Sequence, residues 1–275
     1  NTIRSAVGNA IHADTHDPKL KLTGPYLLNN IIWAEAGYAF YVGDRAQHMV
    51  TSDYNCFWTT GGAKIAYWQG DWDDLNVWRL EMNLDRHSIF AQPKFADADA
   101  NDYRILPPSG YDLSDSPTVD MGPPDMPFDQ EPAPNGGRAN MGAYSNTPMA
   151  AASPEKSIQV LAPYDADALT AGLPVGIVWK SYGLFPAETV DIELFDGVQW
   201  QTVARGVRNT GAWGWTAPAA PGRYRLRVSA SHEPQVLGTT GEFLVVPSGS
   251  RYYVNDASTE GDEYCSAPGD YANTG

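Results

Sequence analysis

The chain has 275 residues, enough for two domains with cores of their own. Its formal net charge of −15 argues against nucleic acid and anionic lipid as partners, because both need clustered Lys and Arg. Nine Trp, fifteen Tyr, 26 Gly and 21 Pro favour β-strands joined by many turns over a helical bundle. No apolar run approaches the roughly 18 residues of a membrane-spanning helix, so we expect no membrane insertion.

Three short stretches at the N-terminus repeat one pattern. Each begins with Asn, continues with apolar residues and has Gly seven positions after the Asn. The Asn–Gly pairs are Asn1 with Gly8, Asn30 with Gly37, and Asn55 with Gly62. The Asn-to-Asn spacings are 29 and 25 residues, and a second β-like run follows each Gly. A period of this length with two strands in each period indicates a β-solenoid.

This repeat predicts which side chains stack from coil to coil. The three Asn side chains form a structural ladder at an inner corner, where their amides pair with one another. The Gly residues of the ladder motif supply turns that need positive φ. Two apolar columns are expected to point inward: Ile3, Ile32 and Phe57 in one, and Ile11, Phe40 and Ile65 in the other.

Residues 73–83 predict a short amphipathic helix after the third coil. Asp73 or Asp74 can cap its N-terminus, and Leu75, Trp78 and Met82 fall on one face. The following stretch, 112–152, is rich in Pro, Asp and Gly, and we expect it to be an irregular cap and connector that covers exposed strand edges.

Residues 30–103 resemble the C-terminal coils of right-handed parallel β-helix repeat proteins, the superfamily that includes pectate and alginate lyases. The resemblance is carried by 52–58 with the Gly61-Gly62 and Tyr67-Trp68 pairs, by 89–102, and by 135–144, which resembles the terminal cap of those proteins. It implies a fold and says little about activity, because one fold hosts many functions.

The second half alternates apolar and polar residues with a period of two. Seven short strands are expected in about ninety residues, the pattern of a β-sandwich; they are 157–161, 176–181, 189–195, 200–204, 212–216, 224–229 and 242–246. Trp179, Trp213 and Trp215 are the predicted core anchors. Residues 176–179, 211–216 and 222–228 resemble the small immunoglobulin-like or fibronectin-III-like domains of secreted proteins, which serve as spacers or as glycan-binding modules.

The tail, 251–265, resembles the opening strand and loop of a further β-helix in large repetitive surface proteins. Tyr252, Tyr253 and Val254 are β-formers, and an unpaired apolar strand can join another sheet edge. We therefore interpret these three residues as an assembly element that joins other copies or neighbouring repeats head to tail. A flexible C-terminal extension is the alternative.

The sequence has few candidate catalytic residues, and they are scattered along the chain. The resembled superfamily contains lyases, which use a base beside Ca²⁺, and hydrolases built on paired carboxylates. The candidates for such roles are His16, Asp17 and Lys19 in one loop, and His48 and Asp53 in another. None has a spacing that requires catalysis, and loops carry such residues anyway. We therefore assign no catalytic residue and lean against an enzyme.

A metal site has one candidate motif. Asp97, Asp99 and Asn101 imitate the first positions of an EF-hand loop, but Asp102 and Pro108 stand where that loop needs Gly and Glu. We expect an acidic turn and no cofactor, with Ca²⁺ as the one ion that this segment leaves open.

Other residues leave alternatives open. The aromatic residues Tyr38, Tyr41, Tyr67, Trp68 and Trp72 could stack on sugar rings, and core packing is the competing interpretation. Cys56 and Cys265 either form a bridge or remain free thiols.

The sequence thus predicts an all-β protein: parallel β-helix coils over 1–111, a cap and connector over 112–152, an immunoglobulin-like sandwich over 153–248 and a tail over 249–275. The leading functional hypothesis is a secreted structural or adhesive repeat segment at a cell surface, associated with polysaccharide. The alternatives are the C-terminal part of a polysaccharide lyase or glycosidase, and a glycan-binding accessory module.

Overall fold

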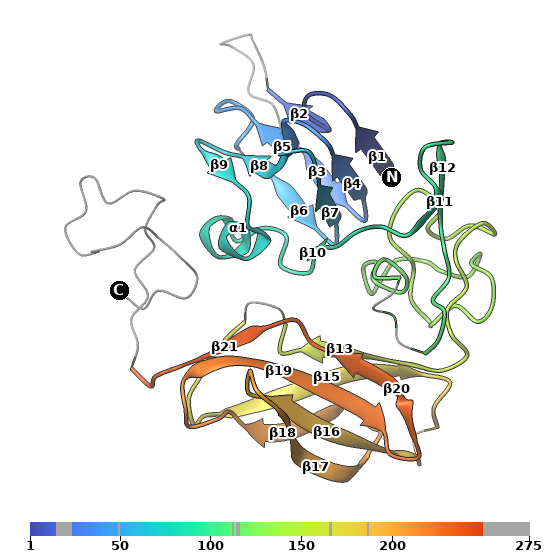
Figure 1. The fold of residues 1–275 in the computed structure, drawn as a ribbon, viewed down its shortest axis with the longest axis vertical. Helices are drawn as coiled ribbons and strands as arrows, with labels where there is room; N and C mark the ends of the chain where they lie inside the picture. Colours follow the sequence, from blue (N-terminus) through green and yellow to red (C-terminus); the bar gives the residue numbers. More distant parts are fainter. Residues whose placement is uncertain are drawn as a thin grey trace. The chain divides into compact units, whose positions relative to one another are not determined.

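The computed structural model describes residues 1–14, 24–48, 50–111, 113, 116–164, 167–185 and 187–249. The chain divides into two compact units, Asn1–Pro154 and Glu155–Gly275. Both are built from β-strands, and the described residues include one α-helix, in the first unit (Figure 1). The expected all-β class is therefore confirmed.

Three sheets organise the first unit, and in each of them strands from successive passes of the chain pair in parallel. The first sheet has the order β1 (Thr2–Ser5), β4 (Ile31–Ala34), β7 (Cys56–Thr59) and β10 (Ile89–Phe90). The second has the order β2 (Ile11–Ala13), β5 (Tyr38–Val42) and β8 (Lys64–Tyr67), with β9 (Asp71–Trp72) antiparallel to β8. The third pairs β3 (Tyr26–Leu28) with β6 (Thr51–Asp53).

The number of strands in each period differs from the prediction. The structure has three strands in a period where the sequence predicts two, because β3 and β6 were not recognised. Each of them is only three residues long, and the Thr-Ser-Asp sequence of β6 has the composition of a turn. Strands this short give too few residues for an alternating pattern to be read.

The inner columns follow the predicted register in one sheet and depart from it in another. Ile32 pairs with Ile3 on one side and with Phe57 on the other, as expected. Phe40 pairs with Ile11 but then with Ala66, so the expected pairing with Ile65 is wrong by one residue. The turn before β8 contains both Gly61 and Gly62 at positive φ and is one residue longer than the turn before β5.

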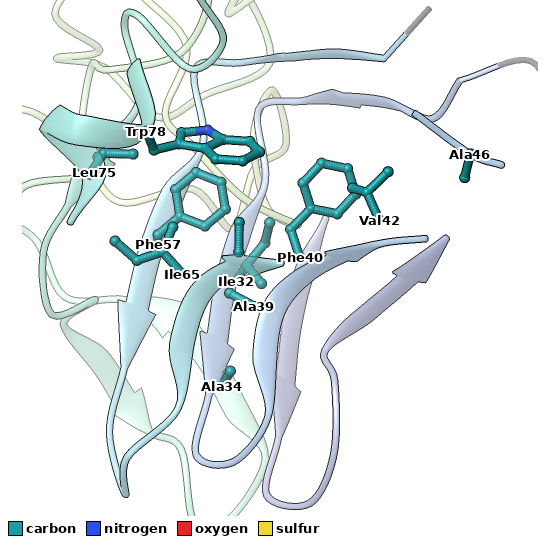
Figure 2. Packing of buried hydrophobic residues seen from close by; sticks show 11 residues of the cluster. Ile32, Ala34, Ala39, Phe40, Val42, Ala46, Phe57, Ile65, Leu75 and Trp78 are labelled. Atoms are coloured by element: carbon teal, nitrogen blue, oxygen red, sulfur yellow. The ribbon is translucent and has the colours of Figure 1, made fainter. Parts of the chain in front are cut away.

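The helix α1 (Leu75–Met82) closes this core from one side. Asp74 accepts hydrogen bonds from the N–H groups of Asn76 and Val77, at 2.7 and 3.2 Å, and so caps the first turn. Leu75 and Trp78 are buried against the inner column, and Figure 2 shows them beside Phe57. The apolar face of the helix thus covers the interior of the third coil.

The rest of the first unit covers the outside of the first sheet. β11 (Phe95–Asp97) and β12 (Asp102–Ile105) form an antiparallel hairpin. Met141, from the segment expected to be a cap, packs with the outward side chains Ile31 and Cys56, and an added Cβ on Gly142 would lie 2.6 Å from Ile31. This part of the segment therefore lies on a lateral face of the stack.

The second unit consists of two sheets. One has the order β13 (Ser157–Ala162), β15 (Pro174–Tyr182) and β18 (Ala212–Thr216). The other has the order β14 (Ala168–Thr170), β21 (Phe243–Val246), β19 (Gly222–Ala230), β16 (Thr189–Phe195) and β17 (Trp200–Arg208), and β20 (Glu233–Thr239) also pairs with β19. All pairings are antiparallel except that of β14 with β21.

Both sheets bury alternate side chains between them. Tyr224, Leu226 and Val228 of β19 point into the core, and the intervening Arg residues point away. The structure has strands at all seven predicted places and adds β14 and β20. Of the three expected core anchors, only Trp179 is buried; Trp213 and Trp215 are half-buried.

Candidate functional site

A ladder of Asn side chains runs through the first unit, and its bonds cross from coil to coil. The Asn1 side-chain amide donates to Asn30 Oδ1 at 3.2 Å, and the Asn30 amide donates to Asn55 Oδ1 at 2.9 Å. The backbone N–H of Asn30 donates to the same Asn55 oxygen at 3.0 Å. Gly8, Gly37 and Gly62 all have positive φ. The structure thus brings the three predicted Asn residues into one row, with Asn55 fully buried.

Two residues that the sequence did not assign continue the ladder. Ser88 lies in the fourth rung, where its hydroxyl accepts the backbone N–H of Asn55 at 2.8 Å. Asp85 is fully buried and accepts hydrogen bonds from Ser88, Ser52, Asn55 and Trp78, at distances from 2.6 to 3.1 Å. Burial raises the pKa of Asp85, although these bonds act in the opposite direction. The ladder therefore ends on a buried carboxyl group and has a structural role.

The outer face of the second sheet carries a row of aromatic rings. His12, Tyr41 and Tyr67 stand in register on β2, β5 and β8. The centroids of His12 and Tyr41 are 4.4 Å apart, and those of Tyr41 and Tyr67 are 4.7 Å apart at an interplanar angle of 7°. Tyr38 lies beside them, tilted by 57° to Tyr41 and 64° to Tyr67. We call these four residues the aromatic row.

Polar groups border the aromatic row. The Tyr38 hydroxyl donates to Asp71 at 2.6 Å, and Lys64 forms an ion pair with the same carboxylate at 2.9 Å. The hydrogen bond to Asp71 is the main reason why the pKa of Tyr38 rises to about 12. Gln69 donates to Gln47 at 2.9 Å nearby on the surface. The face thus combines ring edges and phenol groups with fixed hydrogen-bonding partners.

The other aromatic candidates have a different role. Trp68 and Trp72 pack edge-on against the buried Trp78, with centroids 6.1 and 5.8 Å from it. Both are partly buried and pack against the inner core cluster. Packing is therefore the better interpretation for these two residues.

Two of the five catalytic candidates, His48 and Asp53, lie in the part of the chain that the structure describes. His16, Asp17 and Lys19 lie outside the described residues. His48 is exposed, and Asp53 pairs with His87. Asp53 Oδ2 lies 2.6 Å from His87 Nδ1, Asp53 Oδ1 accepts the His87 N–H at 2.7 Å, and the His87 ring stacks on Tyr54. This pair joins two successive coils.

We expect the Asp53–His87 pair to make stability depend on acid pH. Burial tends to raise the pKa of Asp53, but hydrogen bonds from His87 and Tyr54 outweigh it and the pKa is lowered. A carboxyl group with a lowered folded pKa contributes stability above its unfolded pKa of 3.8, and this contribution is lost as the pH falls through the folded pKa. Asp53→Asn should therefore lose less stability than wild type on acidification below about pH 4. Urea unfolding midpoints measured above and below pH 4 test this prediction, with Asp97→Asn as the control. Equal loss of stability on acidification in wild type and Asp53→Asn would contradict it.

The three predicted metal ligands serve the β11–β12 hairpin turn. Asp97 Oδ1 accepts the N–H of Ala100 at 3.0 Å, and Asn101 accepts the Tyr103 hydroxyl at 3.2 Å. Asp99 forms an ion pair with Arg4 at 3.0 Å. Each of the three side chains therefore has a different partner.

A hollow in the second unit lies between its two sheets. It has a volume of about 940 Å³ and is lined by Trp213 and Trp215 of β18 and by Leu194 and Val203 of the other sheet. None of its lining residues is charged. Such a surface suits an uncharged, ring-bearing ligand.

Cys56 is the one cysteine in the part of the chain that the structure describes. Cys56 is a buried free thiol, and burial raises its pKa to about 12. Cys265 and the assembly residues Tyr252, Tyr253 and Val254 lie outside the described residues. The one helix in the described part of the chain is too short and too polar to cross a bilayer.

No protein-family model matches the chain, and no curated protein matches it. Among solved structures, the fibronectin(III)-like modules of Clostridium thermocellum CbhA are similar at 19% identity, over 32% of this chain and 93% of that one, with a TM-score of 0.26. A TM-score this low establishes neither a shared fold nor a shared function.

Proposed function

We propose that the first unit consists of coils of a right-handed parallel β-helix and that the second is an immunoglobulin-like sandwich. Support for the first comes from three sheets in which strands from successive passes of the chain pair in parallel. Crossover connections between parallel strands of one sheet are almost always right-handed. Support for the second comes from two sheets with mainly antiparallel pairing and alternating buried residues.

The proposed function is that of an extracellular structural or adhesive segment that binds polysaccharide through the aromatic row. The observation that carries this proposal is the register of His12, Tyr41 and Tyr67 on three adjacent strands. The row runs across the strands, so a linear polymer lying along it would meet successive ring edges, with the Tyr38–Asp71–Lys64 group beside them. Ring edges and phenol groups beside fixed hydrogen-bonding groups suit sugars, which present both C–H faces and hydroxyls.

Affinity electrophoresis of the full chain in gels that contain soluble plant and bacterial polysaccharides tests this function. We expect at least one neutral or weakly charged glycan to retard the wild type. Tyr41→Ala and Tyr67→Ala should abolish the retardation, because each opens a gap in the row. Tyr26→Ala is the matched control, since Tyr26 is 69% exposed on a different sheet. Absence of retardation by every glycan, or equal loss in the control, would refute the proposal.

The alternative of a lyase or glycosidase fragment is tested on the same polysaccharides. We expect no release of unsaturated or reducing sugars, with or without Ca²⁺, because the described candidates do not assemble into a catalytic group. Head-to-tail assembly through Tyr252, Tyr253 and Val254 stays a prediction from the sequence.

A further inference from the structure

An irregular part of the first unit buries an unusual set of oxygen-bearing side chains. Residues 116–153 contain no strand or helix among those described, yet Thr118, Asp120 and Glu131 are exposed by only 0%, 1% and 5%. Asn29, which precedes the second rung of the ladder, is exposed by 2% and contacts this segment. Burying two carboxyl groups is costly unless something compensates for their charge.

The two carboxyl groups are linked through Asn140. The backbone N–H of Asn140 donates to Glu131 Oε1 at 3.0 Å, and Asn140 Oδ1 accepts the backbone N–H of Asp120 at 2.8 Å. Burial raises the pKa of Glu131, and the negative charge of Asp120 raises it further. The two acids are therefore close enough to interact in a buried environment.

Three oxygen atoms in this region have no hydrogen-bond partner. They are Glu131 Oε2, Thr118 Oγ1 and Asn29 Oδ1. Their residues are all tied to the same short stretch of chain: Glu131 and Asn29 bond to Asn140, and the Thr118 carbonyl accepts the N–H of Met141 at 2.8 Å. Unsatisfied buried groups are rare in folded proteins and require an explanation. A bound cation accounts for all three oxygen atoms at once, because carboxylate, hydroxyl and amide oxygens are the ligands that hard cations prefer.

We propose that Asp120, Glu131, Asn29 and Thr118 form a Ca²⁺ site that fixes the irregular segment to the coils. All four supply the hard oxygen atoms that Ca²⁺ prefers, and its flexible coordination suits an irregular loop better than the strict octahedron of Mg²⁺. Gly136 makes room for the Asp120 carboxylate, since an added Cβ would lie 1.9 Å from Asp120 Oδ2. No group of three or more His, Cys, Asp or Glu side chains forms a metal site in the described ranges, so neutral oxygen atoms must complete this one.

Calorimetric titration of the EGTA-treated full chain with Ca²⁺, and Tb³⁺ luminescence excited through the protein, test this site. We expect saturable binding of Ca²⁺ and displacement of Tb³⁺ by Ca²⁺. Glu131→Gln keeps the shape and an acceptor for Asn140 but removes the charge, and it should weaken binding at least about tenfold. Asp97→Asn and Asp99→Asn, in the hairpin turn, should leave binding unchanged.

Three results would overturn the proposal. The first is a wild type that binds neither ion, which would indicate that Glu131 is simply protonated. The second is a folded Glu131→Gln variant that binds Ca²⁺ as tightly as wild type. The third is loss of binding in Asp97→Asn or Asp99→Asn, which would place the ion at the hairpin turn. The wild-type titration is decisive even where a variant fails to fold.

Discussion

Replacing Trp78 with alanine is expected to destabilise the first unit by about 4 kcal/mol, the middle of the range for emptying a buried Trp site. Trp78 is fully buried and belongs to the inner core, so its removal leaves a large cavity. Its Nε1 also donates to Asp85 Oδ2 at 2.9 Å, and the variant would leave this buried carboxyl group with one donor fewer. Since domains are stable by only about 5–15 kcal/mol, this single change should bring the unit close to unfolding.

Hydrogen exchange measured by mass spectrometry separates this effect by region. Peptides from β4 and β7 should lose protection in Trp78→Ala, whereas peptides from β16 and β19 of the second unit serve as an internal control. Trp78→Phe retains a ring but not the N–H group, and so separates the cavity from the hydrogen bond. Trp58→Ala is a matched control, because Trp58 is only half-buried on the outer side of β7. Equal protection in Trp78→Ala and wild type would show that α1 does not close the core.

The helix and its inward face could be predicted from the sequence because their signals are local. An Asp at the N-cap and apolar residues at helical spacing lie within a dozen residues of one another. The register of β1, β4 and β7 was equally accessible, since Asn and Gly recur at one offset. The pairing of Phe40 in the second column could not be predicted correctly, because the extra turn residue at Gly61-Gly62 shifts the register of the following strand by one residue. The apolar pattern does not reveal this shift, since Ile65 and Ala66 are both buried.

Contacts between coils escaped prediction where the residue type changes from one coil to the next. Ser88 stands in the row where the three preceding coils have Asn. Its hydroxyl accepts the backbone N–H of Asn55, as the Asn55 side-chain oxygen does for Asn30. Asp53 and His87 are 34 residues apart in sequence, yet stacking of coils places them 2.6 Å apart. Grouping charged residues by closeness in sequence therefore paired Asp53 with His48, which lies in a different part of the same coil.

The buried acids Asp120 and Glu131 escaped prediction for another reason. Their segment is rich in Pro, Gly and Asp, a composition that normally marks an exposed loop. Burial there depends on contact with the outer face of the first sheet, as the packing of Met141 on Ile31 and Cys56 shows. A pattern within the segment does not contain that information, since the partner surface lies up to about a hundred residues earlier in the chain.

Replacing Asn55 with alanine is expected to destabilise the first unit by about 3 kcal/mol, because the change leaves several buried groups without partners at once. Asn55 Oδ1 accepts both the backbone N–H and the side-chain amide of Asn30. Its own amide donates to Leu27 O, Ser52 Oγ and Asp85 Oδ1, each at 3.1 Å. All of these bonds are lost together, and water cannot easily replace them in a site with no exposed surface.

Two further variants test whether the buried bonds of the ladder cause this loss of stability. Asn55→Ser retains an oxygen that can accept the Asn30 N–H, as Ser88 does for Asn55 in the next coil, and should restore part of the lost stability. Asn1→Ala removes the exposed end of the ladder, where solvent satisfies the freed groups, and should cost less than about 1 kcal/mol. Urea unfolding monitored by hydrogen exchange in β4 and β7 measures all three. Equal losses in the free energy of unfolding for Asn55→Ala and Asn1→Ala would show that the ladder is not a cooperative interior element. The apolar columns alone would then hold the register of the coils.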